Sequence, residues 1–446
     1  MQYKYNKDTN SLELVNRNTI IVNNAISSGA GVTLTVTTTE EDFYGRTVNL
    51  TDGIKTITSQ FSNEGIAVFN ITDMEGELTA EITVGEEKFS SKIEIKSNYS
   101  LNLLKATKKI YGASWIMGKQ NTQWTRTDDA IEFSSPVPSI NNGTGFSLFD
   151  DLMPWKEMKI KKYLCGDMVA IPKFYYKIAI EGDLLSVKIS DYKHNGFYIS
   201  PAHMDRNDGK GERDVVYISR YFCGAGHLSK TNENIITNET MAEARTAIQA
   251  LGENIYPFDY LMWLTLWLLY IVEFADWNYA EKIGTSLDDI TYKTGSTDIM
   301  PYHTGTTAEN TGIKSRGVQY RNIEGLLASP HLWLNGIFYK SGHIYLIKNP
   351  QYFNIKDPTA ESVYDLGTYL GGYYNVSSLA LTNSINSIKA SGSVHYDTAG
   401  YTCSYHEVYD NKDPVVLGDG LGWMRFTTCY YDRDRDKVGS RLMILP

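Results

Sequence analysis

The most constraining feature of this 446-residue sequence is an uninterrupted apolar run, YLMWLTLWLLYIV, from Tyr260 to Val272. A membrane-spanning helix needs about 20 apolar residues, and this run is 13 residues long. The run therefore predicts a helix that is buried inside a folded domain and does not insert into a membrane. We expect this helix to begin near Asp259 and to end at about Ala275.

The composition is that of an ordinary folded protein with about two to four domains. Hydrophobic residues make up 42% of the chain and charged residues 21%. The net charge of −10 argues against nucleic acid as the main partner, because binding to phosphates needs clustered Lys and Arg. The four cysteines are widely spaced and form no CxxC pair, which fits synthesis in a reducing cytosol and excludes a disulfide scaffold. The first ten residues, MQYKYNKDTN, do not have the pattern of a signal peptide.

The distribution of tryptophan predicts a domain boundary near residue 105. All eight Trp residues lie at or after Trp115, and residues 1–104 contain neither Trp nor Cys. Within residues 1–104, short segments such as VTLTVTTTE and GELTAEITV alternate apolar with polar residues between Gly, Asn and Asp turns. This pattern predicts an immunoglobulin-like β-sandwich. With 8 Lys and Arg against 14 Asp and Glu, its net charge is 8 − 14 = −6, and we interpret it as an attachment or spacer module.

Residues 105–446 are expected to form an α+β domain with long irregular loops. A first helix is predicted after an Asn238 cap, through TMAEARTAIQAL, with Gly252 at its end. The buried apolar helix is the second. Five tryptophans are expected in the core: Trp115, Trp124, Trp263, Trp267 and Trp333. For Trp423, core and surface positions are equally expected.

A Tyr-rich tract near the end of the chain indicates a recognition surface. Between Tyr352 and Tyr431 lie 11 of the 32 tyrosines, among many Ser, Gly and Asn residues and with little helical or strand periodicity. Long irregular loops in compact domains are usually functional or disordered. Tyr with Ser, Gly and Asn is the composition of evolved binding loops, in which rigid aromatic rings stand beside small hydrogen-bonding residues.

Several pieces of residues 110–446, taken in order, resemble phage tail proteins. The pieces are YGASWIMG, WTRTDDAIEF, MPWKEMK, MVAIPKFYYKI, GFYISPAH, VYISRYF, EARTAIQALG, LWLLYIVEFADWN, GVQYRNIEGLLA and GSRLMILP. In these proteins the C-terminal domain has a C-type-lectin-like fold of the formylglycine-generating-enzyme type. The resemblance implies a tail fibre or tail-tip protein that recognises the bacterial surface. More loosely, residues 1–104 resemble the Ig-like attachment domains of baseplate and fibre proteins.

The resemblance places the ligand-binding residues in the closing segment. In related diversified proteins on this scaffold, exposed variable residues lie between two structural motifs, which here match Gly422–Trp423 and Gly439–Arg441. Ser440 stands where the family commonly has an aromatic residue, which puts the packing of the last strand in doubt. The predicted ligand-binding residues are Tyr401, Tyr405, Trp423, Arg425, Tyr430, Tyr431 and Arg433.

The sequence contains no complete catalytic motif, and we expect no catalytic residue, cofactor or metal. Cys403 and Cys429 are the two thiols that could serve a formylglycine-type oxidase, but we expect packing or loop residues there. The segment DRNDGKGERD, Asp205–Asp214, has Lys210 where an EF-hand requires Gly. We expect it to be a solvated turn; an irregular calcium loop using Asp205, Asp208 and Asp214 is the alternative.

These observations predict a non-enzymatic receptor-binding protein of a phage or phage-like particle, made in the bacterial cytoplasm and carried on the virion tail. Its expected partners are a bacterial surface glycan or protein and, through residues 1–104, tail or baseplate proteins. By analogy with tail fibres, the expected assembly is a homotrimer. The alternatives are an enzyme on the same scaffold, either a formylglycine-type oxidase or a surface-glycan hydrolase, and a purely structural baseplate component.

Overall fold

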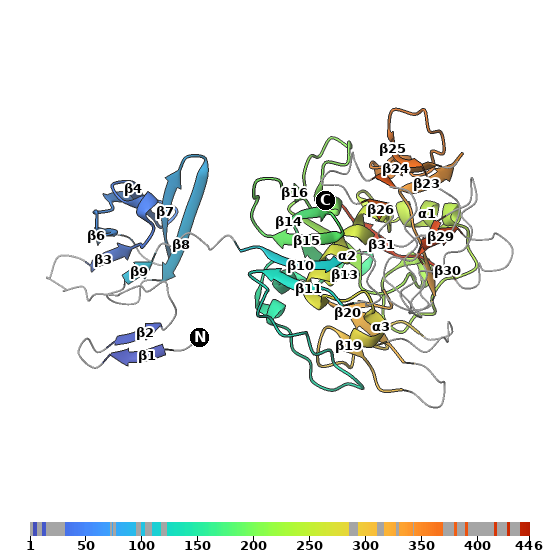
Figure 1. The fold of residues 1–446 in the computed structure, drawn as a ribbon, viewed down its shortest axis with the longest axis horizontal. Helices are drawn as coiled ribbons and strands as arrows, with labels where there is room; N and C mark the ends of the chain where they lie inside the picture. Colours follow the sequence, from blue (N-terminus) through green and yellow to red (C-terminus); the bar gives the residue numbers. More distant parts are fainter. Residues whose placement is uncertain are drawn as a thin grey trace. The chain divides into compact units, whose positions relative to one another are not determined.

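In a computed structural model, the chain divides into two compact units, residues 1–108 and 109–446 (Figure 1). The division lies close to the boundary expected near residue 105. The structure describes residues 3–6, 11–14, 32–71, 74, 77–94, 100–102, 109–116, 123–284, 293–309, 316–326, 330–341, 343–368, 379–380, 389–390, 414–416, 426–428 and 438–446.

The smaller unit consists of short β-strands. Its elements are β1 (Tyr3–Asn6), β2 (Ser11–Leu14), β3 (Val32–Thr37), the 3-10 turn η1 (Glu41–Phe43), β4 (Thr47–Thr51), β5 (Thr56–Gln60), β6 (Ile66–Ile71), β7 (Glu77–Val84), β8 (Glu87–Glu94) and β9 (Ser100–Asn102). β1 and β2 form a hairpin. The others form a three-stranded sheet in the order β6-β3-β9 and a four-stranded sheet in the order β5-β4-β7-β8.

The strands of the smaller unit form because their apolar residues alternate with polar ones. In β6 every second residue, Ala67, Phe69 and Ile71, is buried, and the residues between them are exposed. A period of two places these three side chains on one face of the sheet. They join side chains from β3, β4, β7 and β8 in a single hydrophobic cluster. Both sheets therefore share one core.

The larger unit is also mostly β-structure. Its strands up to residue 257 are β10 (Tyr111–Ile116), β11 (Thr125–Asp128), β12 (Ile160–Tyr163), β13 (Gly166–Pro172), β14 (Tyr175–Glu181), β15 (Leu184–Ser190), β16 (Tyr198–Ile199), β17 (Val215–Ser219) and β18 (Ile255–Pro257). The later strands are β19 (Gly305–Thr306), β20 (Val318–Tyr320), β21 (Ile323–Glu324), β22 (His331–Trp333), β23 (Ile337–Lys340), β24 (His343–Ile347), β25 (Val363–Thr368), β26 (Leu379–Ala380), β27 (Lys389–Ala390), β28 (Pro414–Val416), β29 (Phe426–Thr428), β30 (Val438–Gly439) and β31 (Leu442–Ile444). The helices are α1 (Met241–Gln249), α2 (Tyr260–Phe274) and the one-turn α3 (Tyr279–Lys282), with 3-10 turns η2 (Leu148–Asp151), η3 (Trp155–Glu157), η4 (Pro201–His203), η5 (Ala225–His227) and η6 (Pro350–Tyr352).

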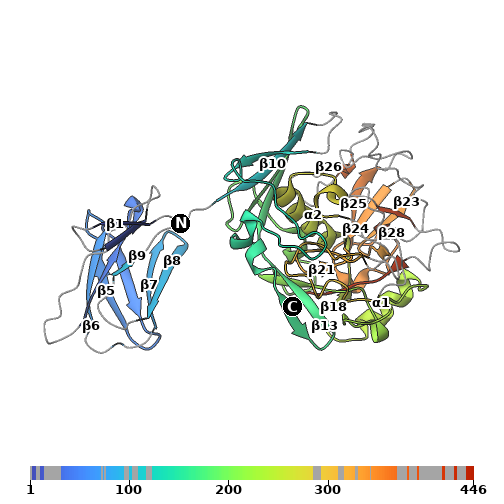
Figure 2. The ribbon, with the colours of Figure 1, turned by 90° about the horizontal axis from the view of Figure 1, so that it is seen from below.

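Two five-stranded sheets and α2 make the centre of the larger unit. The sheets have the orders β11-β10-β15-β14-β16 and β12-β13-β17-β31-β18. α2 packs against β10 and β15 and lies inside the unit in both Figure 1 and Figure 2. Smaller sheets with the orders β19-β20-β21, β29-β28-β22-β30 and β23-β24-β25 complete the unit. The described residues are thus mainly sheet with few helices, which fits the α+β class at this coarse level and a mainly-β class equally.

The prediction for the apolar helix is confirmed. All 15 residues of α2 are buried, and the helix is capped by the Asp259 side chain, which accepts a hydrogen bond from Met262 N. It ends at Ala275, whose backbone is left-handed with φ of 52°. No helix in the described ranges is long and apolar enough to cross a bilayer.

The start of the first predicted helix was wrong by two residues. The cap of α1 is Thr240, which forms a capping box with Glu243, so that each side chain accepts a hydrogen bond from the other residue's backbone N–H. Asn238 has a φ of 66° and lies before the helix. The capping-box pattern, Thr followed three residues later by Glu, was present in the sequence.

The five tryptophans expected in the core are buried, each with 6% exposure or less: Trp115, Trp124, Trp263, Trp267 and Trp333. Trp115 and Trp124 stack with ring centroids 6.3 Å apart, and Trp277 packs edge-on against both. This aromatic cluster belongs to the hydrophobic core that α2 fills.

We predict that the two units fold independently, because each has its own hydrophobic core. A fragment of residues 109–446 should unfold cooperatively, with a melting temperature close to that of one transition of the full chain. Circular dichroism during heating would check this. A fragment that lacks a cooperative transition would contradict the division.

Candidate recognition surface

All seven predicted ligand-binding residues lie outside the described residues, as do Cys403, Cys429 and the Gly422–Trp423 motif. Their chain neighbours are described. Arg425 directly precedes β29, and Tyr430 follows its last residue, Thr428, by two positions. β29 pairs only with β28 among the described strands and is the terminal strand of the sheet β29-β28-β22-β30. Residues next to this edge strand are therefore joined to a sheet that reaches the buried Trp333.

The last strand, β31, joins the end of the chain to the sheets of the larger unit. β31 is inserted between β17 and β18 as a central strand of its sheet. Arg441, which is fully buried, donates hydrogen bonds to the backbone carbonyls of Ser219, Arg220 and Glu324. Its guanidinium also lies 4.1 Å from the centre of the Phe222 ring. One side chain thus joins the last strand to β17 and β21.

The Gly439–Arg441 motif has the buried, structural position that the resemblance predicted. A Cβ added to Gly439 would meet the Phe222 ring at 2.9 Å, so glycine allows this close approach. Ser440 is buried, and its carbonyl accepts a hydrogen bond from Cys223 N at 2.9 Å. Burial also raises the pKa of the Cys223 thiol to about 12. The small Ser440 side chain therefore lies in a buried site next to the unreactive Cys223 thiol.

At the other end of the tract, the sheet β23-β24-β25 presents a polar and aromatic face. Phe338 and Tyr345 stack with centroids 5.0 Å apart, and His343 stacks on Tyr345 at 6.0 Å. The His343 Nδ1 atom lies 2.8 Å from an Asp365 carboxylate oxygen. Exposure rises along the stack, from 2% for Phe338 to 34% for the His343 side chain. An aromatic stack with an exposed imidazole and carboxylate suits hydrogen bonding to a polar ligand.

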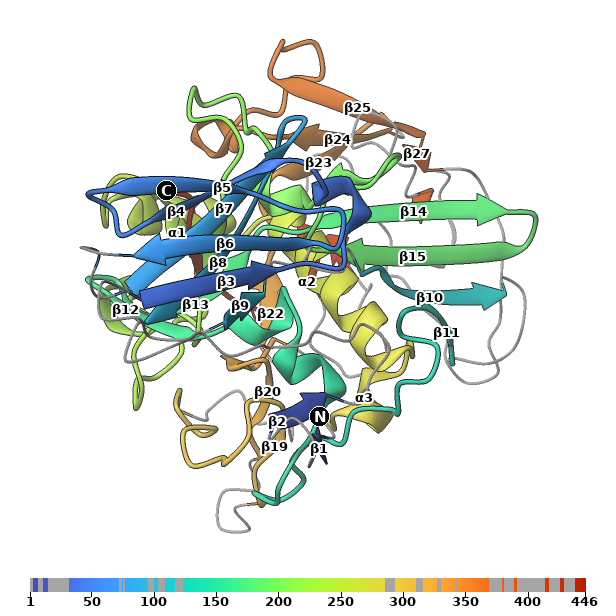
Figure 3. The ribbon, with the colours of Figure 1, turned by 90° about the vertical axis from the view of Figure 1, so that its left-hand side faces the viewer.

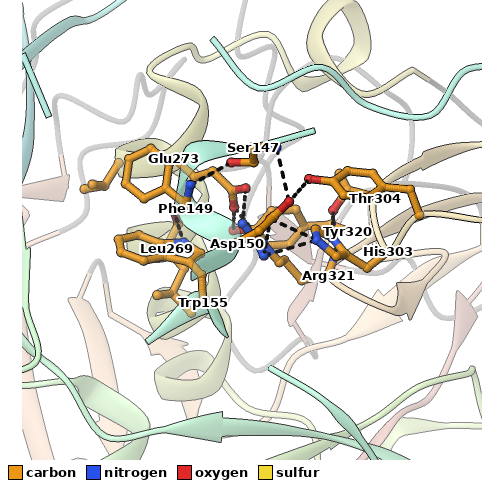
Figure 4. A network of polar contacts seen from close by, with 12 residues as sticks. Ser147, Phe149, Asp150, Trp155, Leu269, Glu273, His303, Thr304, Tyr320 and Arg321 are labelled. Atoms are coloured by element: carbon orange, nitrogen blue, oxygen red, sulfur yellow. Dashed lines mark hydrogen bonds and ion pairs between the residues drawn. The ribbon is translucent and has the colours of Figure 1, made fainter. Parts of the chain in front are cut away.

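A polar cluster in the described residues joins η2, α2 and the β20–β21 turn (Figure 4). The Asp150 carboxylate accepts hydrogen bonds from His303 Nε2 at 3.0 Å and from the Tyr302 hydroxyl at 2.7 Å. It also accepts one from Ser147 N at 3.2 Å and lies 2.9 Å from an Arg321 nitrogen.

Arg321 extends this cluster into the core. Its Nε donates to Glu273 at 3.0 Å, and a second nitrogen pairs with the other oxygen of the same carboxylate. The Tyr320 hydroxyl also donates to Glu273 at 3.0 Å. The side chains of Arg321 and Glu273 are only 2% and 1% exposed. Glu273 lies at the end of α2, so the ion pair ties the buried helix to the β20–β21 turn.

The electrostatics of the cluster favour a structural role over acid–base chemistry. Burial raises the pKa of Asp150, but the hydrogen bond from His303, the charge of Arg321 and the bond from Tyr302 together lower it to about 2. Burial and the Asp150 carboxylate raise the pKa of the Tyr302 hydroxyl above its usual range. A general base needs a pKa near the working pH and a free lone pair. Asp150, with four donors around it, meets neither condition.

Most residues of the segment from Asp205 to Asp214 are exposed, as expected of a solvated turn, but Arg206 and Arg213 are buried. Asp208 pairs with Arg213, and both side chains are only 3% exposed. Asp214 pairs with Lys173 at 2.5 Å, so Asp208 and Asp214 have different cationic partners. Across the described residues, no three His, Cys, Asp or Glu side chains are grouped to hold a metal ion. Arg206, one of the two buried residues of the segment, pairs with Asp259 at the start of α2.

The sequence interpretation missed the residues of the Asp150 cluster. Tyr320 and Arg321 fall within GVQYRNIEGLLA, and Glu273 within LWLLYIVEFADWN, both of which carried the resemblance. A charged residue at the end of an apolar run was the available signal, because a buried carboxylate requires a partner. The sequence does not show which Lys or Arg is the partner of Glu273.

A buried imidazole stands apart from this cluster. His203 Nε2 donates to the carbonyl of Ile171 at 2.9 Å, and Nδ1 lies 2.5 Å from the Ser200 hydroxyl. Burial lowers the pKa of His203 to about 4, against the opposing effect of the Ile171 carbonyl. The fold therefore holds this histidine neutral.

Removing Glu273 should destabilise the protein strongly. We expect Glu273→Ala to lower the free energy of unfolding by about 3–5 kcal/mol, because the buried Arg321 then keeps only Asp150 of its two carboxylate partners. Glu253→Ala, at a side chain that is 86% exposed, is the control and should change stability by about 0.5 kcal/mol or less. The double variant Glu273→Leu with Arg321→Met should be more stable than Glu273→Ala, since a buried ion pair can be replaced by apolar side chains. Equal effects of Glu273→Ala and the control in urea denaturation would refute the assigned role.

His203 should make the protein sensitive to acid. Its pKa is about 4 in the fold and about 6.5 in an unfolded chain. Between these values the unfolded chain binds more protons, so stability is complete above pH 6.5 and falls as the pH drops towards 4. We expect His203→Gln to flatten this part of the stability profile. Parallel slopes for wild type and His203→Gln would count against the prediction.

Comparison with known proteins does not assign this chain to a family. No protein-family model and no curated protein matches the sequence. The resemblance to phage tail proteins therefore depends on the sequence segments that carry it. Function has to be inferred from how the described frame holds the Tyr-rich tract.

Proposed function

We propose that the protein is a receptor-binding protein of a phage tail or phage-like particle, which attaches the particle to a bacterial cell without catalysis. The observation that carries this proposal is the anchoring of the Tyr-rich tract. The part of the tract after Thr368 follows β25 of the sheet β23-β24-β25, and beyond the tract the chain reaches β30 at Val438, next to the buried Arg441. Recognition loops work when a rigid scaffold positions their ends.

We propose the C-type-lectin-like fold of the formylglycine-generating-enzyme type for residues 109–446. A mainly β unit with few helices and long irregular connections supports this assignment. The insertion of the last strand, β31, into the middle of a sheet also supports it, because such closure frees the preceding segment to serve as loops. Fold analogy alone does not establish function.

The proposed mechanism is non-covalent recognition of a surface glycan or protein. Tyrosine rings of the tract would stack on sugar rings or side chains, while Asn, Asp and Arg would supply directional hydrogen bonds. The His343–Asp365 pair borders the same tract and adds a donor and an acceptor. Several copies on one particle, expected as homotrimers, would increase the avidity of weak individual contacts.

For residues 1–108 we propose an Ig-like module that attaches the protein to the tail or baseplate. Two sheets around one small core are the arrangement that such a module needs. Residues 1–104 carry a net charge of −6, against −10 − (−6) = −4 for the rest of the chain. A compact acidic module suits a docking role.

A non-enzymatic role is favoured by the saturated state of the strongest acid–base cluster. Asp150 and Glu273 are each bound by cations and hydroxyls, so neither is poised to transfer a proton. Of the described cysteines, Cys165 and Cys223 are buried, and burial raises the pKa of both thiols. These groups stabilise the frame.

We predict that Tyr430→Ala with Tyr431→Ala abolishes most adsorption to host cells. Removing hot-spot rings should cost about 2–4 kcal/mol of binding, while exposed positions change stability by only about 0.5 kcal/mol. Tyr198→Ala, at a side chain that is 40% exposed outside the tract, is the matched control and should leave adsorption unchanged. A large fall in melting temperature, or normal adsorption, would reject these residues as the receptor site.

A further inference from the structure

An apolar patch on the larger unit is exposed although its backbone is held rigidly. We define the patch as Val137, Ile140, Phe146 and Leu148, whose exposures are 54%, 51%, 52% and 38%. Val137 and Phe146 face each other across an antiparallel bridge, with backbone hydrogen bonds of 2.7 and 2.8 Å, so their side chains share one face. Exposed apolar groups gathered on one surface usually mark an interaction site.

The inner side of this segment is packed against the protein. A Cβ added to Gly145 would overlap the Tyr302 ring at 2.1 Å, so the backbone rests directly on that ring. Ser139 N donates to the Thr304 carbonyl at 2.9 Å, and Thr306 N donates to the Ser139 carbonyl at 2.7 Å. The patch is therefore a preorganised surface, which lowers the entropic cost of binding a partner.

The patch has an acidic rim. Residues 128–151 contain five acidic side chains and no Lys or Arg. Asp128 is paired with Lys188, and Asp150 belongs to the Arg321 cluster, whereas Asp129, Glu132 and Asp151 are exposed. Phe133 packs on Phe149 with centroids 5.3 Å apart, which brings the turn that carries Glu132 next to η2. A partner for this patch should be apolar and basic.

The β12–β13 hairpin of the same chain has the opposite chemistry. Leu164, at its turn, is fully exposed, and the neighbouring Tyr163 is 40% exposed. Residues 156–167 contain four Lys and two acids, a net charge of 4 − 2 = +2 in a chain of net charge −10. Three of these lysines surround Glu157 and lower the pKa of its carboxyl, Lys159 by a hydrogen bond and Lys156 and Lys161 by their charge. Turn positions usually carry polar residues or glycine, so an exposed leucine here calls for a binding role.

We propose that the hairpin tip of one copy docks on the apolar patch of a second copy, with Leu164 on the patch and the lysines facing the acidic rim. The two surfaces lie on different parts of the larger unit: in Figure 3, β12 is at the left and β19, which pairs with the patch segment through Ser139, is at the bottom. A contact between two different surfaces is heterologous, and it closes into a ring or extends as a filament. This inference goes beyond the proposed function, because it requires only a second copy and no receptor.

Charge reversal in the full-length protein tests the contact. Lys156→Glu with Lys161→Glu removes two exposed lysines but keeps the Lys159–Glu157 and Lys162–Asp167 pairs. Sedimentation over a concentration series should show self-association of the wild type and a dissociation constant raised about tenfold or more in this variant, because like charges then meet. Glu132→Lys with Asp151→Lys should have the same effect, and the combination of all four changes should restore association. Leu164→Asp should also weaken association, and the charge reversals should not restore association in this variant.

The control is Lys109→Glu with Lys193→Glu, which changes the net charge equally at two exposed lysines outside the hairpin. It should associate as the wild type does. All variants should keep the wild-type melting temperature, since the changed residues are exposed. A monomeric wild type, an equal effect of the control, or no recovery in the fourfold variant would overturn the proposal. Adsorption to cells is not used, so this result is independent of the receptor assignment.

Discussion

The structure of the larger unit depends on the complete burial of α2. Its 15 residues fill the core, but both ends carry backbone groups that the helix itself cannot satisfy. At the start, Asp259 caps the helix and is paired with the buried Arg206. At the end, Arg126 donates to the carbonyls of Val272 and Glu273, where a cation is favoured by the helix dipole. Both ends of this buried apolar helix are thus stabilised by charged residues from distant parts of the chain.

The same device stabilises irregular backbone elsewhere. Arg441 and Arg206 are fully buried, and each donates to main-chain carbonyls: Arg441 to those of Ser219 and Glu324, and Arg206 to that of Lys348. Guanidinium groups suit this role because they offer five donors in a fixed plane. Segments far apart in the sequence are therefore joined by buried arginine side chains as well as by strand pairing.

Two surfaces with different chemistry follow from this frame. The Tyr-rich tract and the adjoining His343–Asp365 pair suit a polar ligand, whereas the patch at Val137 and Phe146 suits an apolar, basic partner. In the proposed receptor-binding role, joining copies would strengthen attachment, because multivalency multiplies weak contacts. Recognition and self-association can then evolve separately.

Local periodicity by itself determined much of this protein. It predicted α2 from the apolar run at Tyr260–Val272, the buried Trp263 and Trp267, and the short alternating strands of the N-terminal unit, because each signal lies within a few neighbouring residues. The capping box at Thr240 could also have been found in the sequence. Only tertiary structure decided that Glu273 meets Arg321, that Asp259 meets Arg206, and that Arg441 crosses to Glu324. Such pairs join positions brought together by packing, and a charged residue in a sequence carries no record of which distant partner its burial will require.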